Sequence, residues 1–416
     1  MLSLLISETA FIIGLVAFLG LILQRKPINF VIEGTIKAVI GYVILLFGAF
    51  LATQQLSQLA VLLERAFNVQ GIMPNNEMIV GISQWFFGKT IGYIMLVGMI
   101  FHLLIARFTR FKYIFLTGHH ILYMASLIAV IMAGSGLPFY LQIIIGSVVL
   151  ACSMTFFPAI CQPMMRQIIP NQNVAIGHFG SVGYVVSGFL GKVVGGSHKK
   201  PEINANQSTN LGLLNNPNVM IMLFMLTLFL FVGIIGGKQA FFEVSGQGNI
   251  IFNAFMQAFQ FTAAIYIIII GVRMMLTEVL TAFQGIADKL VPKAIPALDC
   301  PVIFPYAPIG VVIGFASSLA GGFAGIAILI YFNMQIVIPA MIAHFFSGST
   351  AGVFGFVMGG YRGAIVGAFT HGLIITFLPL LILPVMYQLG YTQTTFSDTD
   401  FGVVGLLLYY LLEILT

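Results

Sequence analysis

The chain has 416 residues, of which 59% are hydrophobic and 7% are charged, and its formal net charge is +5. Soluble domains carry about 25% charged residues, so this composition excludes a soluble domain of useful size. It predicts an all-α polytopic membrane protein. Basic residues lie at the ends of apolar runs, which indicates membrane topology and argues against nucleic acid as a partner.

Apolar runs long enough to cross a lipid bilayer recur along the whole chain. We count about eleven spans, at roughly 8–25, 34–60, 88–106, 113–134, 139–165, 218–237, 254–283, 305–331, 335–357, 361–387 and 401–416. The first run is interpreted as a span and not as a cleaved signal, because no basic segment precedes it and no small-residue cleavage site follows it.

The basic residues predict an orientation for these spans. With the N-terminus outside and the C-terminus in the cytoplasm, nearly all basic loop residues fall on the cytoplasmic side, and Lys238 is the clear exception. The residues that fit are Arg25, Lys26, Arg107, Arg110, Lys112, Arg166, Lys192, Lys199, Lys200, Lys289, Lys293 and Arg362. This is the distribution expected for a multi-pass protein of a bacterial inner (plasma) membrane.

The two halves of the chain resemble each other. "FFPAICQPMMRQI" (156–168) matches "FLPLLILPVMYQL" (377–389), with its prolines in register, and Gly48 pairs with Gly271 at an offset of 223. Equivalent helices then lie five spans apart, and an odd number reverses their orientation. An inverted repeat is typical of transporters whose substrate site lies near the midplane.

This repeat predicts three parts. Residues 1–195 form the first repeat, with five spans and a candidate re-entrant segment. Residues 196–217, which are polar and rich in asparagine, form a cytoplasmic connector. Residues 218–416 form the second repeat and a terminal helix.

Two of the candidate site segments contain histidines. In "LTGHHILYMASLIAV" (116–130), His119 and His120 are either ligands or packed helix residues bonded to carbonyls. Adjacent helical positions point about 100° apart, so we expect the two histidines not to serve the same cavity. In "NVAIGHFGSVGY" (173–184), His178 belongs either to a flexible cytoplasmic loop or to a re-entrant segment that lines a water-filled site.

Two further segments lie in the second half. In "AIPALDCPVIFPYAP" (294–308), Asp299 either caps a helix or accepts hydrogen bonds from sugar hydroxyls among helix-breaking prolines. The repeat places Asn76 at the equivalent position. In "AHFFSGSTAGVFGFVMGGYRG" (343–363), His344, Ser347 and Thr350 offer polar groups, although its glycines equally suit close helix packing.

Other signatures are missing from the sequence. It contains no phosphate-binding P-loop and no H-E-x-x-H motif. Its three cysteines form no C-x-x-C pair. We therefore expect no metal, no cofactor and no disulfide, and the candidate residues favour a neutral-to-anionic polyol as ligand.

These motifs together resemble the membrane component, enzyme IIC, of the ascorbate-type phosphoenolpyruvate-dependent phosphotransferase system. The resemblance covers nearly the whole chain, and it rests on "EGTIKAVIGYVILLFGAF", "IFLTGHHILYMASLIAV", "VAIGHF", "GVRMMLTEVLTAFQGIADKLVPKAIPALDCP" and "FFSGSTAGVFGFVMGGYRGA". It implies a homodimer whose protomers have eleven spans, a V-motif domain and a core domain that moves like an elevator. Separate cytoplasmic IIA and IIB proteins would relay phosphate to the sugar, so this component of a sugar phosphotransferase is expected to carry no phosphoacceptor of its own.

The resemblance also implies site residues. Its T-G-H histidine falls on His119, its I-G-H histidine on His178 and its A-x-D-C acid on Asp299, while His120 is expected to be a neighbour. Tyr123 and Phe179 stand where ascorbate-type members commonly carry glutamine, and Glu77 stands near the place of a tyrosine. The expected substrate site thus comprises His119, Tyr123, His178, Phe179, Asp299, Glu77, Ser347 and Thr350. The departures predict a changed ligand preference, because unpaired buried polar groups are costly.

Two other functions remain open from the sequence. A proton-coupled secondary transporter of a small polyol or sugar acid would use Asp299 and the histidines as a proton relay. A channel or a non-transporting receptor is the third class, but a channel would need a selectivity filter, and no filter-like sequence is visible.

Overall fold

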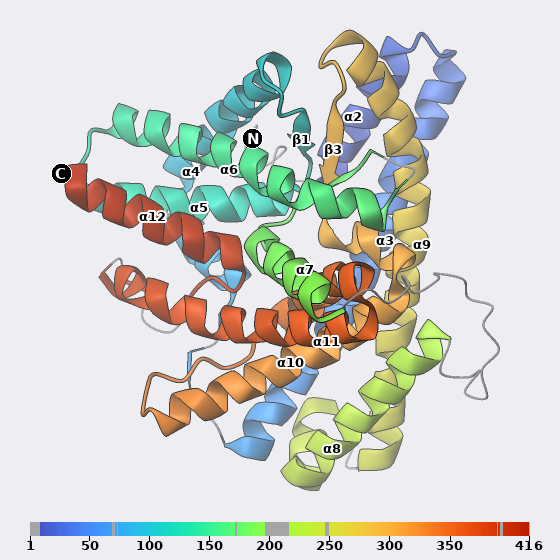
Figure 1. Ribbon diagram of the computed structural model, residues 1–416, viewed down its shortest axis with the longest axis vertical. Coiled ribbons are helices and arrows are strands. Elements are labelled where there is room, and N and C mark those ends of the chain that lie inside the picture. The colour runs from blue at the N-terminus through green and yellow to red at the C-terminus, as the bar shows by residue number, and fades with distance from the viewer. Residues whose placement is uncertain are drawn as a thin grey trace.

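The computed structural model describes residues 9–68, 71–72, 74–170, 173–195, 216–245, 249–388, 390–391 and 394–415. The chain is almost entirely helical (Figure 1). Its elements are α2 (Thr9–Leu23), α3 (Ile28–Phe67), α4 (Asn76–Phe108), β1 (Tyr113–Phe115), α5 (Gly118–Gly134), α6 (Phe139–Ile168), β2 (Ala175–Ile176), α7 (Ser181–Gly195), α8 (Pro217–Ser245), α9 (Ile250–Lys289), β3 (Ile295–Leu298), the 3-10 helix η2 (Cys300–Tyr306), α10 (Pro308–Tyr331), α11 (Met341–Gln388) and α12 (Thr399–Leu415).

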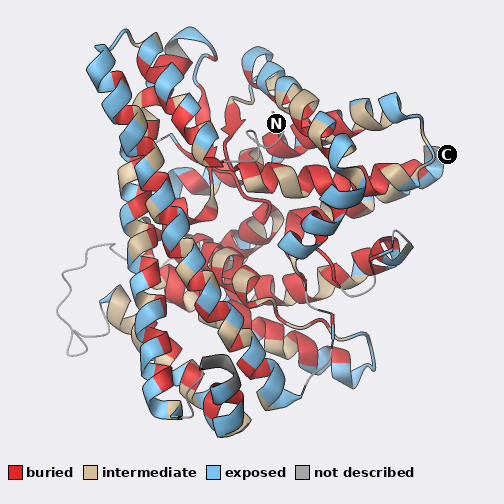
Figure 2. Cartoon of the chain, turned by 180° about the vertical axis from the view of Figure 1, so that it is seen from behind, coloured by how far each residue is buried: buried red, intermediate tan, exposed pale blue. Residues whose placement is uncertain are grey.

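The polytopic, all-helical class is confirmed by the helix lengths. Seven helices in the described part of the chain are long and apolar enough to cross a membrane, and α2, α5 and α7 are shorter apolar helices. The outer faces of the long helices are exposed and apolar (Figure 2). Such surfaces suit contact with lipid. The count of about eleven spans stays a prediction.

Four helices, α2, α3, α8 and α9, pack on one another along one side of the molecule (Figure 1). We call them the frame helices. α3 and α9 each have 40 residues, and they cross where glycines let the two backbones approach. A Cβ added to Gly48 would lie 2.7 Å from the backbone nitrogen of Ile268, and a Cβ added to Gly271 would collide with the backbone nitrogen of Leu45. A side chain at either glycine would force the helices apart.

One sequence offset relates these two close approaches. Gly48 and Gly271 are 223 positions apart, and their partners Leu45 and Ile268 are separated by the same 223 positions. The crossing of α3 and α9 is therefore made twice by equivalent residues, once from each half of the chain.

Two parallel backbone pairings repeat this relation. Ile114 of β1 lies opposite Pro296 of β3, and Val337 forms an isolated bridge with Ile72. Ile114 and Val337 are 223 positions apart, and Ile72 and Pro296 miss that offset by one residue. In each pair, one half supplies the segment that follows its 40-residue helix, α3 or α9. The other half supplies the segment that follows α4 or α10.

The remaining helices, α4 to α7 and α10 to α12, form a second group, which we call the core helices. A parallel sheet with strand order β1-β3-β2 ties their two halves together. The expected span at 113–134 is wrong at its start, because residues 113–115 form β1 and α5 begins at Gly118. The partner of β1 comes from residues far along the chain, and local periodicity cannot reveal such a partner.

The predicted break between the spans at 335–357 and 361–387 is confirmed. They correspond to the two helical parts of α11, which starts at Met341 and is interrupted by the non-helical Gly359 and Gly360. Gly360 has a φ of 64°, which favours glycine. The segment after His178 is helical from Ser181 and forms α7, which packs against this break through Gly191. The connector 196–217 lies almost wholly outside the described residues.

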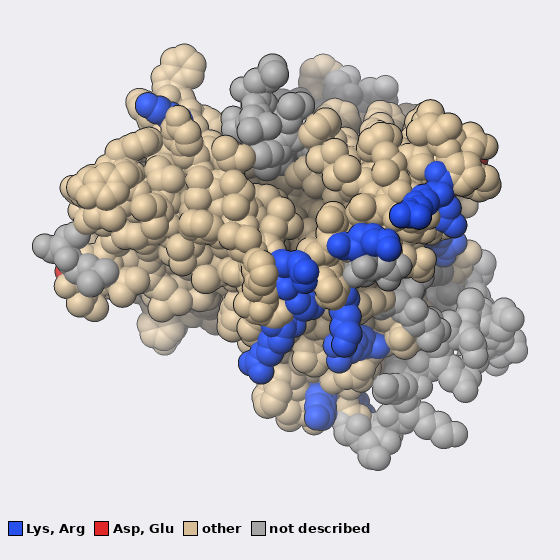
Figure 3. Space-filling view, turned by 90° about the horizontal axis from the view of Figure 1, so that it is seen from above, with Lys and Arg blue, Asp and Glu red and all other residues tan. Residues whose placement is uncertain are grey.

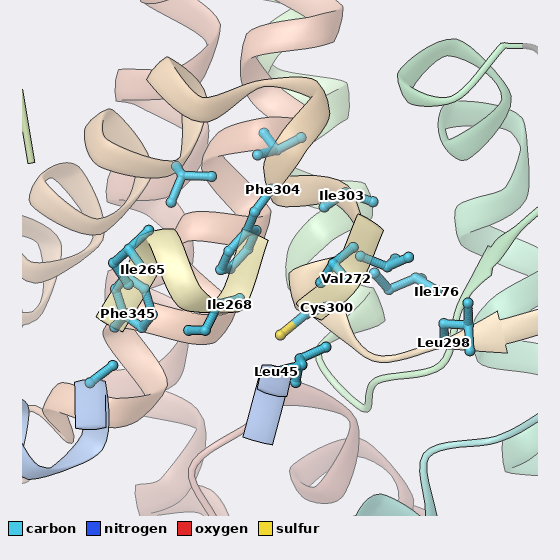
Figure 4. Packing of buried hydrophobic residues seen from close by; sticks show 14 of the residues in the cluster. Leu45, Ile176, Ile265, Ile268, Val272, Leu298, Cys300, Ile303, Phe304 and Phe345 are labelled. Carbon is cyan, nitrogen blue, oxygen red and sulfur yellow. The ribbon is translucent and has the colours of Figure 1, made fainter. Parts of the chain in front are cut away.

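Apolar side chains fill the junction between the two groups. Figure 4 shows Cys300, Ile303 and Phe304 of η2 among side chains of α9 and Leu45 of α3. This packing fixes the start of η2, where Asp299 stands as the N-cap residue. The irregular segment that carries Asp299 is therefore held from several sides.

Basic side chains gather on one face of the molecule, the upper face of Figure 1 (Figure 3). The parallel register places two of their loops together, because Ile295 donates its backbone N–H to the carbonyl oxygen of Lys112 at 2.8 Å. The basic loops after α4 and α9 therefore lie side by side. This agrees with the prediction that both loops lie on the same side of the membrane.

Candidate functional site

A cavity of about 670 Å³ lies between α3 and the broken segments of the core helices. One wall is a stripe of α3 at helical spacing, formed by Tyr42, Leu45, Ala49, Thr53, Leu56 and Ala60. The opposite wall, which we call the polar wall, is formed by Asn75, Asn76, Glu77, His119, His120, Tyr123, His178, Asp299, Ser397 and Asp398. A mostly apolar wall facing a few convergent polar groups is typical of a small-molecule site.

Asp299 and His119 meet across the two halves of the chain. Asp299 Oδ1 accepts the backbone N–H of Cys300 at 2.7 Å, and its Oδ2 lies 3.3 Å from His119 Nε2. The two side chains are 20% and 34% exposed, respectively, so both can reach a ligand in the cavity. Asp299 therefore caps η2 and also faces the cavity, and its binding of sugar hydroxyls stays a prediction.

His120 and His178 lie beside this pair. Their ring centroids are 4.0 Å apart, and both residues are buried while still lining the cavity. The expectation that the adjacent histidines His119 and His120 do not serve the same cavity is wrong. Both belong to the first turn of α5, and the cavity meets the end of that helix rather than one of its sides. Among the described residues, His120 Nδ1 has no hydrogen-bond partner.

A chain of hydrogen bonds runs from His178 to a buried carboxylate. His178 Nδ1 lies 2.7 Å from the Tyr184 hydroxyl, which lies 3.0 Å from Ser347 Oγ, and Ser347 donates to Asp398 Oδ1 at 2.8 Å. Because the single proton of Ser347 goes to Asp398, Tyr184 donates to Ser347 and accepts from His178. This assignment protonates His178 at Nδ1 and leaves Nε2 as an acceptor when the ring is neutral.

Asp398 lines the cavity, as His120 and Asn76 do, although none of the three was among the expected site residues. Its Oδ2 accepts from Asn76 Nδ2 at 2.8 Å and from Ser397 Oγ at 3.1 Å, while Asn76 Oδ1 accepts the backbone N–H of Ser397 at 2.9 Å. Asn76 and Asp398 thus join the start of α4 to the segment before α12. Asn76 and Asp299 are 223 positions apart, the separation that the predicted repeat gives to equivalent residues.

A weak repeat signal points to the missed segment. "FGSVG" (179–183) and "FGVVG" (401–405) agree at four of five positions, 222 positions apart. That match would have aligned the segment around His178 with "SDTD" (397–400). Asp400 accepts the backbone N–H groups of Ser181 and Val182 at 2.8 and 2.9 Å, so it fixes the start of α7.

Glu77 and Tyr123 close the polar wall on the side of α4. The Tyr123 hydroxyl donates to Glu77 Oε1 at 3.2 Å. The ring of Tyr123 also lies edge-on to His119, with centroids 5.7 Å apart. Five of the expected site residues, His119, Tyr123, His178, Asp299 and Glu77, are therefore brought together around one cavity.

Three expected site residues do not line the cavity. Phe179 is fully buried and stacks on Phe115, with ring centroids 5.0 Å apart. Ser347 lies behind the polar wall as part of the chain to Asp398, and Thr350 donates to the Phe346 carbonyl oxygen at 2.7 Å. His344, from the same segment as Ser347, lies 2.9 Å from Ser318 Oγ and is buried between α10 and α11.

The side chains around Asp299 also include the ligand types of metal sites. The groups are His119, His120 and Asp299, and His178, Asp299 and Cys300, with ligand atoms within 4.8 Å of one another in each group. Imidazole and carboxylate ligands suit several transition metals. The same atoms suit polyol hydroxyls, which both donate and accept hydrogen bonds.

Comparisons with known proteins identify the family of this chain. Residues 4–400 match the family described as PTS system sugar-specific permease component. The chain is also similar to the protein named "Ascorbate-specific PTS system EIIC component" of Mycoplasma pneumoniae. The two are 24% identical over 417 residues, an alignment that covers 86% of this chain and 62% of that relative. The chain thus spans less than two thirds of the length of the curated relative.

Proposed function

Because this chain belongs to the family of sugar-specific permease components of phosphotransferase systems, we propose that it is the IIC subunit that binds a sugar and moves it across the membrane. The ascorbate-type resemblance and the named relative support that subfamily. The observation that carries the proposal is the polar wall, which gathers imidazoles, carboxylates and amides against an apolar stripe of α3. Such groups can bind the hydroxyls of a sugar or a polyol in place of water.

The substrate site of the proposal is centred on Asp299, His119 and His178, with Tyr123 and Glu77 at its edge. His120, Asn76 and Asp398 join them from the structure. Phe179, Ser347 and Thr350 would support the site indirectly. They pack against, or hydrogen-bond to, residues that line the cavity.

We extend the proposal to movement. The frame helices would be the fixed V-motif domain and the core helices the part that carries sugar across the membrane like an elevator. Support comes from the pairs related by an offset of 223 at the crossing of α3 and α9, and by 223 and 224 at the two parallel backbone pairings. A two-fold relation of this kind is typical of alternating-access transporters. Residues 1–195 and 218–416 would be the two repeats.

The proposed partners follow from the family. Cytoplasmic IIA and IIB proteins would bring phosphate to the sugar as it leaves the cavity, and a second copy of this chain would complete a homodimer. The face where basic residues gather would be the cytoplasmic face of a bacterial plasma membrane, with the N-terminus outside and the C-terminus inside.

A proton-coupled secondary transporter is the second candidate. The observation that favours it is the hydrogen-bond chain from His178 through Tyr184 and Ser347 to Asp398, because such a chain can pass a proton.

Uptake of a radiolabelled pentitol or of L-ascorbate separates the two candidates. The test uses cells that express the chain together with its IIA and IIB proteins. Group translocation predicts phosphorylated sugar inside the cells and no uptake in a strain without the phosphohistidine carrier. Uptake that survives this deletion but collapses with an uncoupler would contradict it and favour proton coupling.

A further inference from the structure

The fixed charges around the cavity have one sign. Glu77, Asp299 and Asp398 belong to the polar wall, and Glu64 lines the cavity farther along α3. No lysine or arginine is among the described residues that line it. The groups that could offset this negative charge are imidazoles.

The imidazoles cannot balance the carboxylates of the polar wall. A proton held between His119 and Asp299, 3.3 Å apart, neutralises one carboxylate. The rings of His120 and His178 have centroids 4.0 Å apart, and like charges that close disfavour each other. With at most one of these two rings charged, three carboxylates face at most two positive charges, and the wall stays net negative.

The hydrogen-bond inventory points in the same direction. Tyr123 gives its single proton to Glu77, and Asn76 gives one of its amide protons to Asp398. The carboxylates can only accept hydrogen bonds. A polyol supplies a donor with each hydroxyl, whereas an anion presents oxygens that need donors, and the Tyr123 hydroxyl and one Asn76 amide proton are already committed to carboxylates.

We propose, resting on the function proposed above, that this cavity selects a neutral polyhydroxy compound, such as a sugar alcohol or an aldose, over an anionic sugar acid. Glu77 is the residue that enforces the selection. It lies on the exposed side of the wall, and the carboxylate of an acid bound there would meet it as a like charge.

Matched ligand pairs test this proposal. Xylitol and D-xylonate share a carbon skeleton and differ in whether one end is a hydroxymethyl or a carboxylate, and the same holds for galactitol and D-galactonate. Each would be titrated calorimetrically into the purified full chain at neutral pH, with L-ascorbate as a further anion. We expect the better alcohol to bind at least about tenfold more tightly than its acid, since repulsion across a partly desolvated site reaches that size.

The variant Glu77→Gln removes the charge and keeps the shape. We expect it to tighten the binding of each acid relative to its alcohol by about tenfold. Glu33→Gln is the matched control, because Glu33 is exposed on α3 outside the cavity and pairs with Lys37. Asp398→Asn is the second charge-removing variant, and melting temperatures show whether each variant is folded.

The outcomes separate this inference from the proposed function. Acids that bind as tightly as their alcohols, with a ratio that neither Glu77→Gln nor Asp398→Asn changes, overturn the charge selection and leave sugar transport standing. If no alcohol, aldose or acid binds the folded chain, the proposed sugar site itself is overturned, and the selection falls with it.

Discussion

Replacing Asp299 by asparagine separates its two roles. The Asp299 side chain caps η2 through the backbone N–H of Cys300 and also faces the cavity beside His119. Asparagine caps helices about as well as aspartate, so Asp299→Asn should keep the local fold. It removes the charge that strengthens hydrogen bonds to sugar hydroxyls, and such a bond is worth about 1.5–3 kcal/mol. Binding should therefore weaken by about ten- to a hundredfold.

The assay combines thermal melting with a binding titration on purified protein. A panel of L-ascorbate, xylitol, D-arabinitol and D-xylose identifies the tightest ligand, which is then titrated into each variant. Asp299→Asn should melt near the unmutated protein and bind weakly. Asp299→Ala should bind weakly and also melt lower, because it loses the cap, which is worth about 1 kcal/mol.

The opposite result would assign Asp299 a structural role alone. If Asp299→Asn binds every ligand as the unmutated chain does, and Asp299→Ala loses only stability, then Asp299 is a helix cap and does not belong to the site.

Three further predictions concern packing, the hydrogen-bond chain and topology. Gly271→Leu should abolish a monodisperse peak in size-exclusion chromatography, because the leucine side chain would meet the backbone of α3. The control Gly88→Ala should elute normally, because nothing lies within 4 Å of a Cβ at Gly88, and equal profiles for the two variants would contradict the crossing. Tyr184→Phe keeps the ring but cuts the chain to His178, so titration should show binding weakened by about tenfold, and unchanged affinity would remove the chain from the site. A cysteine at Asn206, which lies outside the described residues, should resist an impermeant thiol reagent in intact cells, and labelling from outside would reverse the proposed orientation.

The class of the protein and several residues of the candidate site could be predicted from the sequence. Apolar runs predict membrane helices because a bilayer leaves few alternatives for the backbone. His119, His178 and Asp299 could be singled out because polar residues are rare in such runs. The offset between Gly48 and Gly271 also proved to mark a real crossing, since glycine is needed where backbones touch.

Tertiary structure alone decided what these residues meet. Local periodicity describes one helix at a time. A prediction from it therefore placed β1 in a span and His119 and His120 at different cavities. It could not show that β3 lies beside β1, or that the cavity meets the first turn of α5.

The same limit explains Asp398 and Phe179. Asp398 lies in a polar segment that resembles an ordinary loop, and its role appears only when Asn76 and Ser347 approach it from distant parts of the chain. Phe179 follows His178 in sequence but packs on Phe115 in the core. Side chains of neighbouring residues point in different directions, so which of them faces a ligand depends on how the two halves of the chain pack together.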